Sequence, residues 1–208
     1  MTSFPVLPRS FYENPNVTSV AKSLLGKRLV AELPEGKTVG RIVETEAYEG
    51  ITDRAAHSWN NRRTARTEIM FGQGGKVYIY LCYGLHHMFN VVTNKIEHPH
   101  AVLIRAVEPL EGEELMAKRT GKELGDPTIT RGPGNLCKAL GLSKIHNGVD
   151  LVSGIIRIED DGFQVKKGAV LATPRIGVDY AGEHARWLYR FILKNNPYVS
   201  KTKSLTKK

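Results

Sequence analysis

The order of apolar and polar residues predicts a pair of strands near the start of the chain. Between residues 38 and 48 the side chains alternate with the period of two that a β-strand requires. One face of this strand combines acidic and aromatic side chains with an apolar one: Ile42, Glu44, Glu46 and Tyr48. The apolar run 28–33 predicts a partner strand, and the Pro and Gly of segment 34–37 are typical of a turn. We therefore expect a hairpin that ends in an acidic stretch.

A second hairpin is predicted between residues 76 and 93. A two-residue turn with Gly84 at its first central position, the type II′ arrangement, would put Tyr83 at the tip. Tyr78 and Tyr80 share one face of the first strand. An exposed tyrosine at an apex suits a surface that stacks on bases or wedges between them, although an ordinary turn aromatic and a packed Tyr78 remain alternatives.

Helices and further strands surround these hairpins in the predicted fold. The pattern indicates helices over 15–25, 110–120 and 131–140, the second opened by Pro109 and closed by Gly121, and strands over 101–107, 154–159, 169–173, 175–178 and 186–193. No internal repeat or long linker divides the chain. We expect one α+β domain over residues 1–200, followed by a basic, flexible tail over 201–208.

The amino-acid composition and net charge narrow the class of binding partner. The 208 residues carry 30 Lys and Arg against 21 Asp and Glu, a formal charge of +9, which favours an anionic partner such as nucleic acid. Cys82 and Cys137 are far apart in apolar or helical contexts and predict neither a disulfide nor a metal site. No apolar run has the length of a membrane span. A reducing compartment and no cofactor are expected.

Candidate chemistry gathers around Glu46. Glu46 and Tyr48 project to the same side of their strand, and His57 follows in a short loop, so a planar ring could be held over a general base. The alternative is an edge strand whose glutamates face water. Arg105 lies within the apolar run 102–107 and needs an anionic partner, either Glu46 or a bound phosphate.

Two further segments could bind phosphate. Segment 59–67 contains Arg62, Arg63 and Arg66 with almost no core residue, which suits a loop along a phosphate backbone, although a solvated basic loop has the same composition. Near Gly134 a tight turn feeds a short helix, whose free backbone amides could bind a phosphate.

Several separated stretches together form a family pattern: Val43-Glu-Thr-Glu-Ala-Tyr48, Ala55-Ala-His-Ser58, Tyr78-Ile-Tyr80 with Tyr83-Gly84, Asn90, Leu103-Ile-Arg-Ala-Val-Glu-Pro109, Arg131-Gly-Pro-Gly-Asn-Leu136 and Arg175-Ile-Gly-Val178. In this order they resemble the alkyladenine (3-methyladenine or methylpurine) DNA glycosylase family. The resemblance extends from Phe11 to about Ser200. It implies a single mixed α/β domain with a curved antiparallel sheet, flanking helices and a protruding tyrosine hairpin.

The resemblance also implies roles for individual residues. Glu46 would be the general base that activates the attacking water, assisted by Arg105. Tyr48, His57 and Tyr80 would enclose the flipped purine.

Further roles follow for the rim of the pocket. Asn90 would line the pocket and obstruct bases with the guanine 2-amino group, and Tyr83 would fill the gap left in the duplex. Leu85 and His86, which follow this wedge, would contact DNA beside it.

The expected function is a monofunctional DNA repair glycosylase without lyase activity. Its substrates would be alkylated purines, hypoxanthine and ethenoadenine in double-stranded DNA, and its product an abasic site. We expect a monomer, cytoplasmic in a prokaryote or nuclear in a eukaryote, with no membrane or protein partner. The alternatives are a non-catalytic nucleic-acid-binding module, in which Glu46 merely pairs with Arg105, and an enzyme that hydrolyses a small N-riboside.

Overall fold

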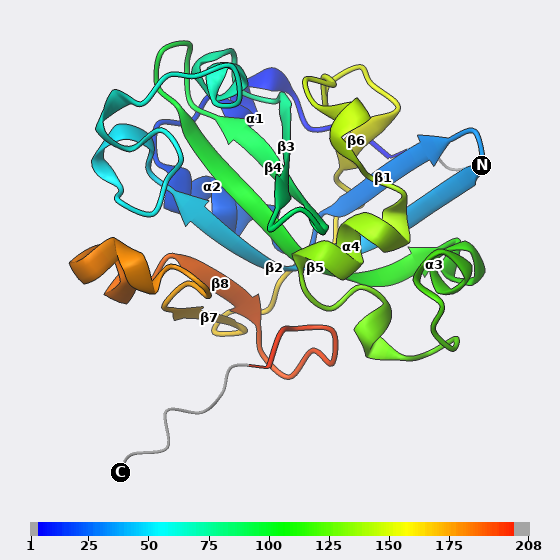
Figure 1. Ribbon diagram of the computed structural model, residues 1–208. Helices are drawn as coiled ribbons and strands as arrows, with labels where there is room; N and C mark the ends of the chain where they lie inside the picture. The colour runs from blue at the N-terminus through cyan, green and yellow to red at the C-terminus, as the bar shows by residue number, and fades with distance from the viewer. Residues whose placement is uncertain (1–3, 202–208) are drawn as a thin grey trace.

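The computed structural model describes residues 4–201, and its central feature is a curved, eight-stranded antiparallel sheet (Figure 1). The strand order is β3-β4-β5-β2-β1-β6, while β8 pairs with both β2 and β7. The strands are β1 (Arg28–Leu33), β2 (Gly36–Tyr48), β3 (Val77–Cys82), β4 (His86–Thr93), β5 (His100–Glu111), β6 (Ile156–Glu159), β7 (Val170–Thr173) and β8 (Arg190–Leu193). The α+β architecture inferred from the sequence is confirmed.

Four α-helices accompany the sheet in the described part of the chain: α1 (Arg9–Tyr12), α2 (Val17–Leu24), α3 (Glu113–Thr120) and α4 (Pro133–Leu140). The side chain of Asn16 caps α2 by accepting a hydrogen bond from the Ser19 amide at 2.9 Å. Apolar side chains of α2 and α4, Leu24 and Leu136 among them, join those of the sheet in one large core. Burial of these helix faces against the strands holds the sheet in place.

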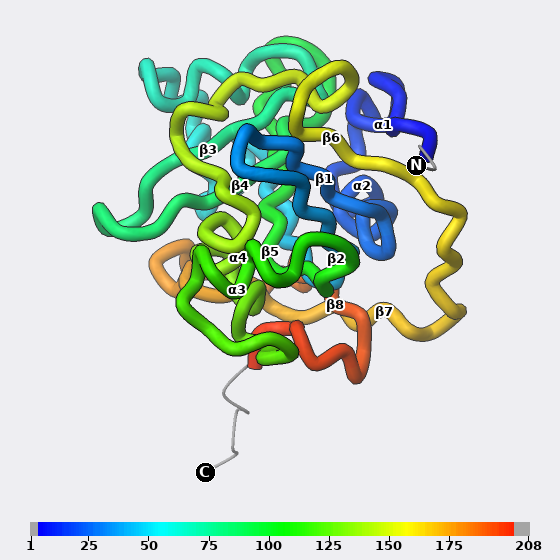
Figure 2. Tube along the Cα trace, turned by 90° about the vertical axis from the view of Figure 1, so that its right-hand side faces the viewer, coloured from blue at the N-terminus to red at the C-terminus, as the bar shows by residue number. Residues whose placement is uncertain are grey.

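The chain between β6 and β7 supports the same core from outside. Residues 160–169 run down the flank of the molecule past α2 (Figure 2). Arg41 of β2 holds this segment by pairing with Asp161 at 2.9 Å and lying 4.1 Å over the ring of Phe163. Of the predicted tail over 201–208, residues 202–208 lie outside the described residues.

Three of the predicted elements need correction. Pro109 and Leu110 do not open a helix, because β5 continues to Glu111 and α3 begins only at Glu113. The long β2 extends the ladder this far, pairing Gly40 with Pro109. The stretch 175–178 is a loop, and the predicted strand 186–193 is formed only from residue 190 onward.

The turn of the tyrosine hairpin lies one residue earlier than predicted. The Leu85 amide donates to the Cys82 carbonyl at 3.0 Å, so Tyr83 and Gly84 are the central residues. Both have positive φ, 49° and 71°, the signature of a type I′ turn rather than type II′. The predicted position of Tyr83 at the tip holds.

Candidate active site

Glu44 and Glu46 are in the middle of the sheet. Residues 44–46 of β2 pair with β5 on one side and with β8 on the other, and both carboxylate side chains have no exposed surface. The edge-strand alternative, with glutamates facing water, is therefore wrong. Two buried acids in a central strand require cationic or hydrogen-bonding partners.

Irregular pairing directs these acids away from the apolar core. The ladder between β2 and β5 shifts register on both sides of Glu44, next to Arg105. Ile42 packs in the main core with Ala47, whereas Glu44 and Glu46 turn to Arg105. The predicted common face of Ile42 and the two glutamates is thus wrong at Ile42, because a bulge interrupts the strict alternation.

Glu46 accepts three hydrogen bonds. Its Oε2 accepts from Arg105 Nη1 at 3.2 Å and from the Tyr48 hydroxyl at 2.9 Å, and its Oε1 accepts from the Ile176 amide at 2.8 Å. Burial and the nearby charge of Glu46 raise the pKa of Tyr48 well above its usual range, so this hydroxyl remains a donor. The carboxylate is held in one orientation from three directions.

Glu44 supports the same arginine from behind. Its Oε1 accepts from Arg105 Nε at 2.9 Å and Arg190 Nε at 2.7 Å, and its Oε2 accepts from the Ser200 amide at 2.7 Å. Burial acts to raise the pKa of Glu44, but Arg105 and Arg190 outweigh it and keep that pKa below its usual range. Burial likewise acts to lower the pKa of Arg105, but Glu46 and Glu44 hold it above its usual range.

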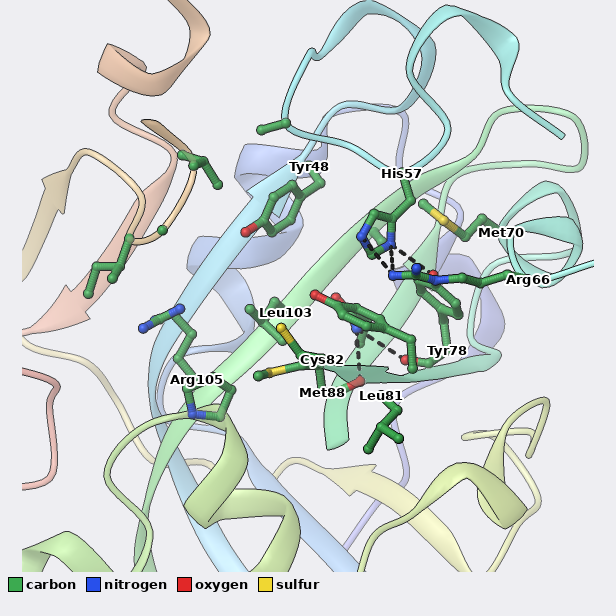
Figure 3. Close-up of a pocket in the computed structure, with 18 of the residues that line it drawn as sticks. Tyr48, His57, Arg66, Met70, Tyr78, Leu81, Cys82, Met88, Leu103 and Arg105 are labelled. Atoms are coloured by element: carbon green, nitrogen blue, oxygen red, sulfur yellow. Dashed lines mark hydrogen bonds between the residues drawn. The ribbon is translucent and has the colours of Figure 1, made fainter. Parts of the chain in front are cut away.

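An open cavity of about 460 Å³ adjoins this cluster. Figure 3 shows Tyr48 and Arg105 on one side of it and His57, Arg66 and Tyr78 on the other. Tyr80, Asn90, Leu103 and Ile176 also line it. Glu46 itself is not on the wall, but all three groups that bind its carboxylate belong to lining residues. The predicted catalytic pair and purine-enclosing side chains thus lie around one cavity.

His57 is held as a neutral ring. Burial, followed by the charges of Arg66 and Arg62, lowers the pKa of His57 to about 4. Arg66 Nη2 is 3.0 Å from Nε2 and 3.3 Å from Nδ1 of this ring, and because a guanidinium only donates, the neutral ring accepts from it. Nδ1 is also 2.9 Å from the Tyr78 hydroxyl, with which it forms a hydrogen bond. Tyr80 packs edge-on against this ring, with the ring centroids 4.5 Å apart.

Asn90 forms part of the cavity floor beside Tyr78. It is buried, and its Nδ2 donates to the backbone carbonyls of Tyr78 and Met88, each at 3.1 Å. Both amide protons are therefore engaged by β3 and β4, which fixes the side chain against the wall.

The β3–β4 hairpin projects from the body of the molecule (Figure 2). At its tip Tyr83 is 92% exposed and Leu85 is 77% exposed. His86, also exposed, has its ring against Gly134, where an added Cβ would come within 2.9 Å of Nδ1. Of the four residues predicted to contact DNA on this side, Tyr83 lines the cavity, and His86 lies against Gly134, the neighbour of the lining residue Pro133.

The three arginines of segment 59–67 differ in their surroundings. Arg62 and Arg66 line a second cavity beside the first. Arg63 instead forms ion pairs with Glu68 and Glu97, each at 2.7 Å. Its guanidinium is occupied by carboxylates, in contrast to those of its neighbours.

Sequence reasoning missed a buried ion pair behind Tyr48. Arg175 pairs with Asp53 through both terminal nitrogens, and neither side chain has exposed surface. The guanidinium also lies over the Tyr48 ring, 4.7 Å from its centroid, and donates to the Ala47 carbonyl at 2.9 Å. This clamp fixes the loop that brings the Ile176 amide to Glu46. No local signal indicates it, because the partners are 122 residues apart.

Other features of the described chain are quickly stated. Cys82 and Cys137 are free thiols, and burial raises the pKa of Cys137 to about 12. Within residues 4–201 no three His, Cys, Asp or Glu side chains are grouped as a metal site would require. No helix in this range has both the length and the apolar character needed to cross a bilayer.

Comparisons with known proteins show the family of this chain. Residues 10–197 match the family model described as methylpurine-DNA glycosylase. A protein of Methanocella arvoryzae named "Putative 3-methyladenine DNA glycosylase" is 51% identical over 198 residues, covering 95% of this chain and 96% of its own. Relatives with the same name from Alkaliphilus oremlandii and Bdellovibrio bacteriovorus are 47% and 45% identical, covering 94% of this chain and 98% and 99% of theirs. The chain therefore belongs to the methylpurine-DNA glycosylase family.

Proposed function

We propose that this protein hydrolyses the N-glycosidic bond of damaged purines, such as 3-methyladenine, 7-methylguanine, hypoxanthine and ethenoadenine, in double-stranded DNA. The observation that carries the proposal is the carboxylate of Glu46, buried and held by Arg105, Tyr48 and the Ile176 amide immediately behind an aromatic cavity. The volume of that cavity is within the range of small-ligand clefts, about 300–1,000 Å³. The relatives named as 3-methyladenine DNA glycosylases support the same substrate class.

The damaged nucleotide has to leave the duplex before its bond can break. Extrusion costs a few kcal/mol and costs least for a damaged or badly paired base, so selection begins at this step. The exposed Tyr83 on the projecting hairpin is suited to fill the gap that the purine leaves. Leu85, His86 and Gly134 lie along the same edge and would follow the strand.

Within the cavity, aromatic rings enclose the purine. Tyr48 is on one side and His57 on the other (Figure 3), and Tyr80, which also lines the cavity, packs edge-on against His57. Purines alkylated at N3 or N7 are cationic, and their attraction to such rings contributes about 0.5–2 kcal/mol. Arg175 covers Tyr48 but does not line the cavity, so the cavity face of that ring is left for the base. Asn90, fixed on the floor, would obstruct a 2-amino group.

Bond breaking develops positive charge on the sugar, which Glu46 can stabilise while it orients and deprotonates the attacking water. Its Oε1 accepts only the Ile176 amide, so this oxygen retains a lone pair for the water. Arg105 and Ile176 both border the cavity, and the water would enter between them. Arg105 keeps Glu46 in place without neutralising the free oxygen.

Hydrolysis without lyase activity also fits the lining. Bifunctional cleavage requires an amine nucleophile at the sugar. The described residues that line the cavity include no lysine. We therefore assign the enzyme a single hydrolytic step that leaves an abasic site. We also propose that it acts as a monomer.

The test compares wild type with Glu46→Gln on duplexes that contain hypoxanthine or ethenoadenine. Loss of the general base should slow free-base release by about 10²–10⁴-fold, with lesion binding retained. Glu114→Gln, which changes an exposed carboxylate of α3 outside the cavity, is the matched control and should release base at the wild-type rate.

Two outcomes would overturn the proposal. Undiminished base release by Glu46→Gln would remove Glu46 from the mechanism. Steep salt-dependent binding without base release by wild type would identify a binding module in which Glu46 only pairs with Arg105.

A further inference from the structure

A second cavity, of about 420 Å³, lies beside the first. The two share the side chains of His57, Arg66 and Tyr180. The remaining wall is strongly basic and partly aromatic: Arg54, Arg62 and Trp59 line it together with Ala56, Thr64 and Thr67. No carboxylate is among these lining residues of the described chain. We call it the side cavity.

The arginines of the side cavity have no counter-charge. Across residues 4–201, the arginines that form no ion pair with a carboxylate are Arg54, Arg62, Arg66, Arg131 and Arg186. The first three of these line this one cavity. Nine other arginines of these residues pair with carboxylates, so the exposed, uncompensated charge concentrated here favours binding of an external anion.

Their positions are nevertheless constrained. Arg54 lies over the half-exposed indole of Trp59, 5.7 Å from the ring centroid, and Arg66 lies over Tyr80 at 4.8 Å while donating to His57. The backbone at Arg62 is held by the Thr67 hydroxyl, which donates to its carbonyl at 3.0 Å. Stacking on rings orients a guanidinium without consuming its charge or all of its N–H donors.

Arg63 provides the contrast within the same segment. It is sequestered by Glu68 and Glu97 and lies over Phe71, and it does not line the side cavity. The loop thus separates one neutralised arginine from two that face the cavity. Asn60 and Asn61, which precede these arginines, take the left-handed conformation, with φ of 55° and 57°.

We propose that the side cavity binds a backbone phosphodiester of the damaged strand, next to the extruded nucleotide. This inference rests on the proposed function and extends it to Arg54, which lies outside the segment 59–67 that the sequence indicated. Guanidinium forks match the oxygens of a phosphodiester. Because the side cavity shares a wall with the base cavity, a strand whose purine occupies one would bring its adjacent phosphate to the other.

The experiment measures binding and base release together. Single-turnover release from a hypoxanthine duplex gives the protein concentration at half-maximal rate, and fluorescence anisotropy gives affinity for lesion and undamaged duplexes, each from 50 to 200 mM salt. For Arg54→Ala and Arg62→Ala we expect roughly tenfold weaker lesion-duplex binding at 100 mM salt. The slope of log K against log salt should fall by about 0.9 for each phosphate that the variant no longer neutralises.

The matched control is Lys118→Ala, which removes one exposed positive charge from α3 outside both cavities. Its salt slope and its affinity should equal those of wild type, and the melting temperatures of all variants should agree. Arg54→Ala and Arg62→Ala should lose less affinity for undamaged duplex than for lesion duplex, because the phosphate binds beside an extruded nucleotide.

The two proposals fail separately. Wild type that releases base, with unchanged salt slopes in Arg54→Ala and Arg62→Ala, would overturn the side cavity alone. Wild type without base release would overturn the proposed function, while the anisotropy slopes would still decide whether the side cavity binds DNA. Replacing chloride by inorganic phosphate at constant ionic strength should weaken wild-type binding more than that of the variants, because free phosphate competes with the strand for the same guanidiniums. Equal weakening of wild type and variants would contradict a phosphate site in the side cavity.

Discussion

At the scale of single residues, the site depends on the balance between buried carboxylates and guanidiniums. Glu44 and Glu46 would repel each other two positions apart in a buried strand, and Arg105 resolves this by donating to both. Arg190, fully buried as well, adds a second cation on Glu44. Two carboxylates and two guanidiniums therefore form a compact cluster in which Arg105 lines the cavity and Glu46 lies directly behind the wall.

His57 provides a pH-dependent test at this scale. The ring has a pKa of about 4, whereas an unfolded histidine titrates near 6.5. Between these values the unfolded chain binds a proton that the folded chain rejects, so His57 reduces the stability of the folded state as the pH falls through this window. We expect the free energy of unfolding of wild type to decline more between pH 7 and 4.5 than that of His57→Gln, measured by urea denaturation.

An NMR titration of the His57 ring checks the cause. A ring that remains neutral at pH 5 agrees with burial beside Arg66 and Arg62. A midpoint near 6.5, or identical pH dependence of stability in both proteins, would contradict the structure. His98, an exposed ring outside the cavity, serves as the internal comparison.

At the scale of elements, the β3–β4 hairpin combines a rigid base with a strained tip. Tyr78 is packed between the strands, while Tyr83 has the positive φ that a non-glycine residue rarely adopts. Its side chain makes almost no contact with the folded protein, being 92% exposed. The position therefore contributes little to stability, and its aromatic side chain is explained by an external partner.

Tyr83→Ala should slow base release from duplex DNA by about tenfold or more, because stacking on the gap is worth about 1–3 kcal/mol. Release from the same lesion in a single strand should change little, since no gap has to be filled. The measurement is single-turnover release from both substrates.

Ile145→Ala serves as the control for Tyr83→Ala. Ile145 is 85% exposed and lies outside the cavities, so this variant should leave both rates at the wild-type value. Equal reductions on duplex and single strand in Tyr83→Ala would contradict the wedge. Base release from a free nucleoside that is indifferent to Tyr83→Ala would favour N-riboside hydrolysis instead.

The Arg175 loop shows how an element without regular structure can still be fixed. Predicted as a strand, it has no ladder partner among the described strands, and its order comes from the ion pair with Asp53 and from the Ile176 amide on Glu46. Gly177, with φ of 75°, allows the chain to turn beside the cavity. In this loop the ion pair and the hydrogen bond to Glu46 hold the chain in place, as backbone pairing does in the sheet.

At the scale of the whole molecule, the end of the described chain returns to the buried cluster of Glu44, Glu46, Arg105 and Arg190. Ser200 donates its amide to Glu44, and its carbonyl accepts from Arg190 at 2.9 Å. The Pro197 carbonyl also accepts from Arg131. The C-terminal segment therefore covers Glu44 and Arg190, whereas the cavity adjoins the same cluster at Arg105.

Ser200→Pro tests this closure, because proline removes the amide donor to Glu44. The loss of one hydrogen bond to a buried carboxylate should lower the free energy of unfolding by about 1.5–3 kcal/mol and slow base release. Thermal or urea denaturation and the release assay measure the two effects.

Ser200→Ala is the matched control. The Ser200 hydroxyl is buried with no hydrogen-bond partner in the described structure, so removing it should leave stability unchanged or slightly higher. Equal stabilities of the proline and alanine variants would show that the amide contributes nothing to the cluster.

The local sequence by itself determined individual secondary-structure elements and marked candidate residues. Alternation and turn residues placed the β1–β2 and β3–β4 hairpins, and Gly141 ended α4 in the left-handed conformation that glycine allows. Acidic and guanidinium groups within apolar runs marked Glu46 and Arg105 as a candidate pair, since such groups cannot be buried alone.

Tertiary structure decided which groups meet. The bulge beside Glu44 turned Ile42 to the core against the simple alternation, and the Ile176 amide reached Glu46 from 130 residues away. Arg63 was withdrawn from the side cavity by Glu97, while Arg54 entered it. Register shifts and contacts between distant segments depend on how the whole sheet packs, so periodicity along the chain carries no record of them.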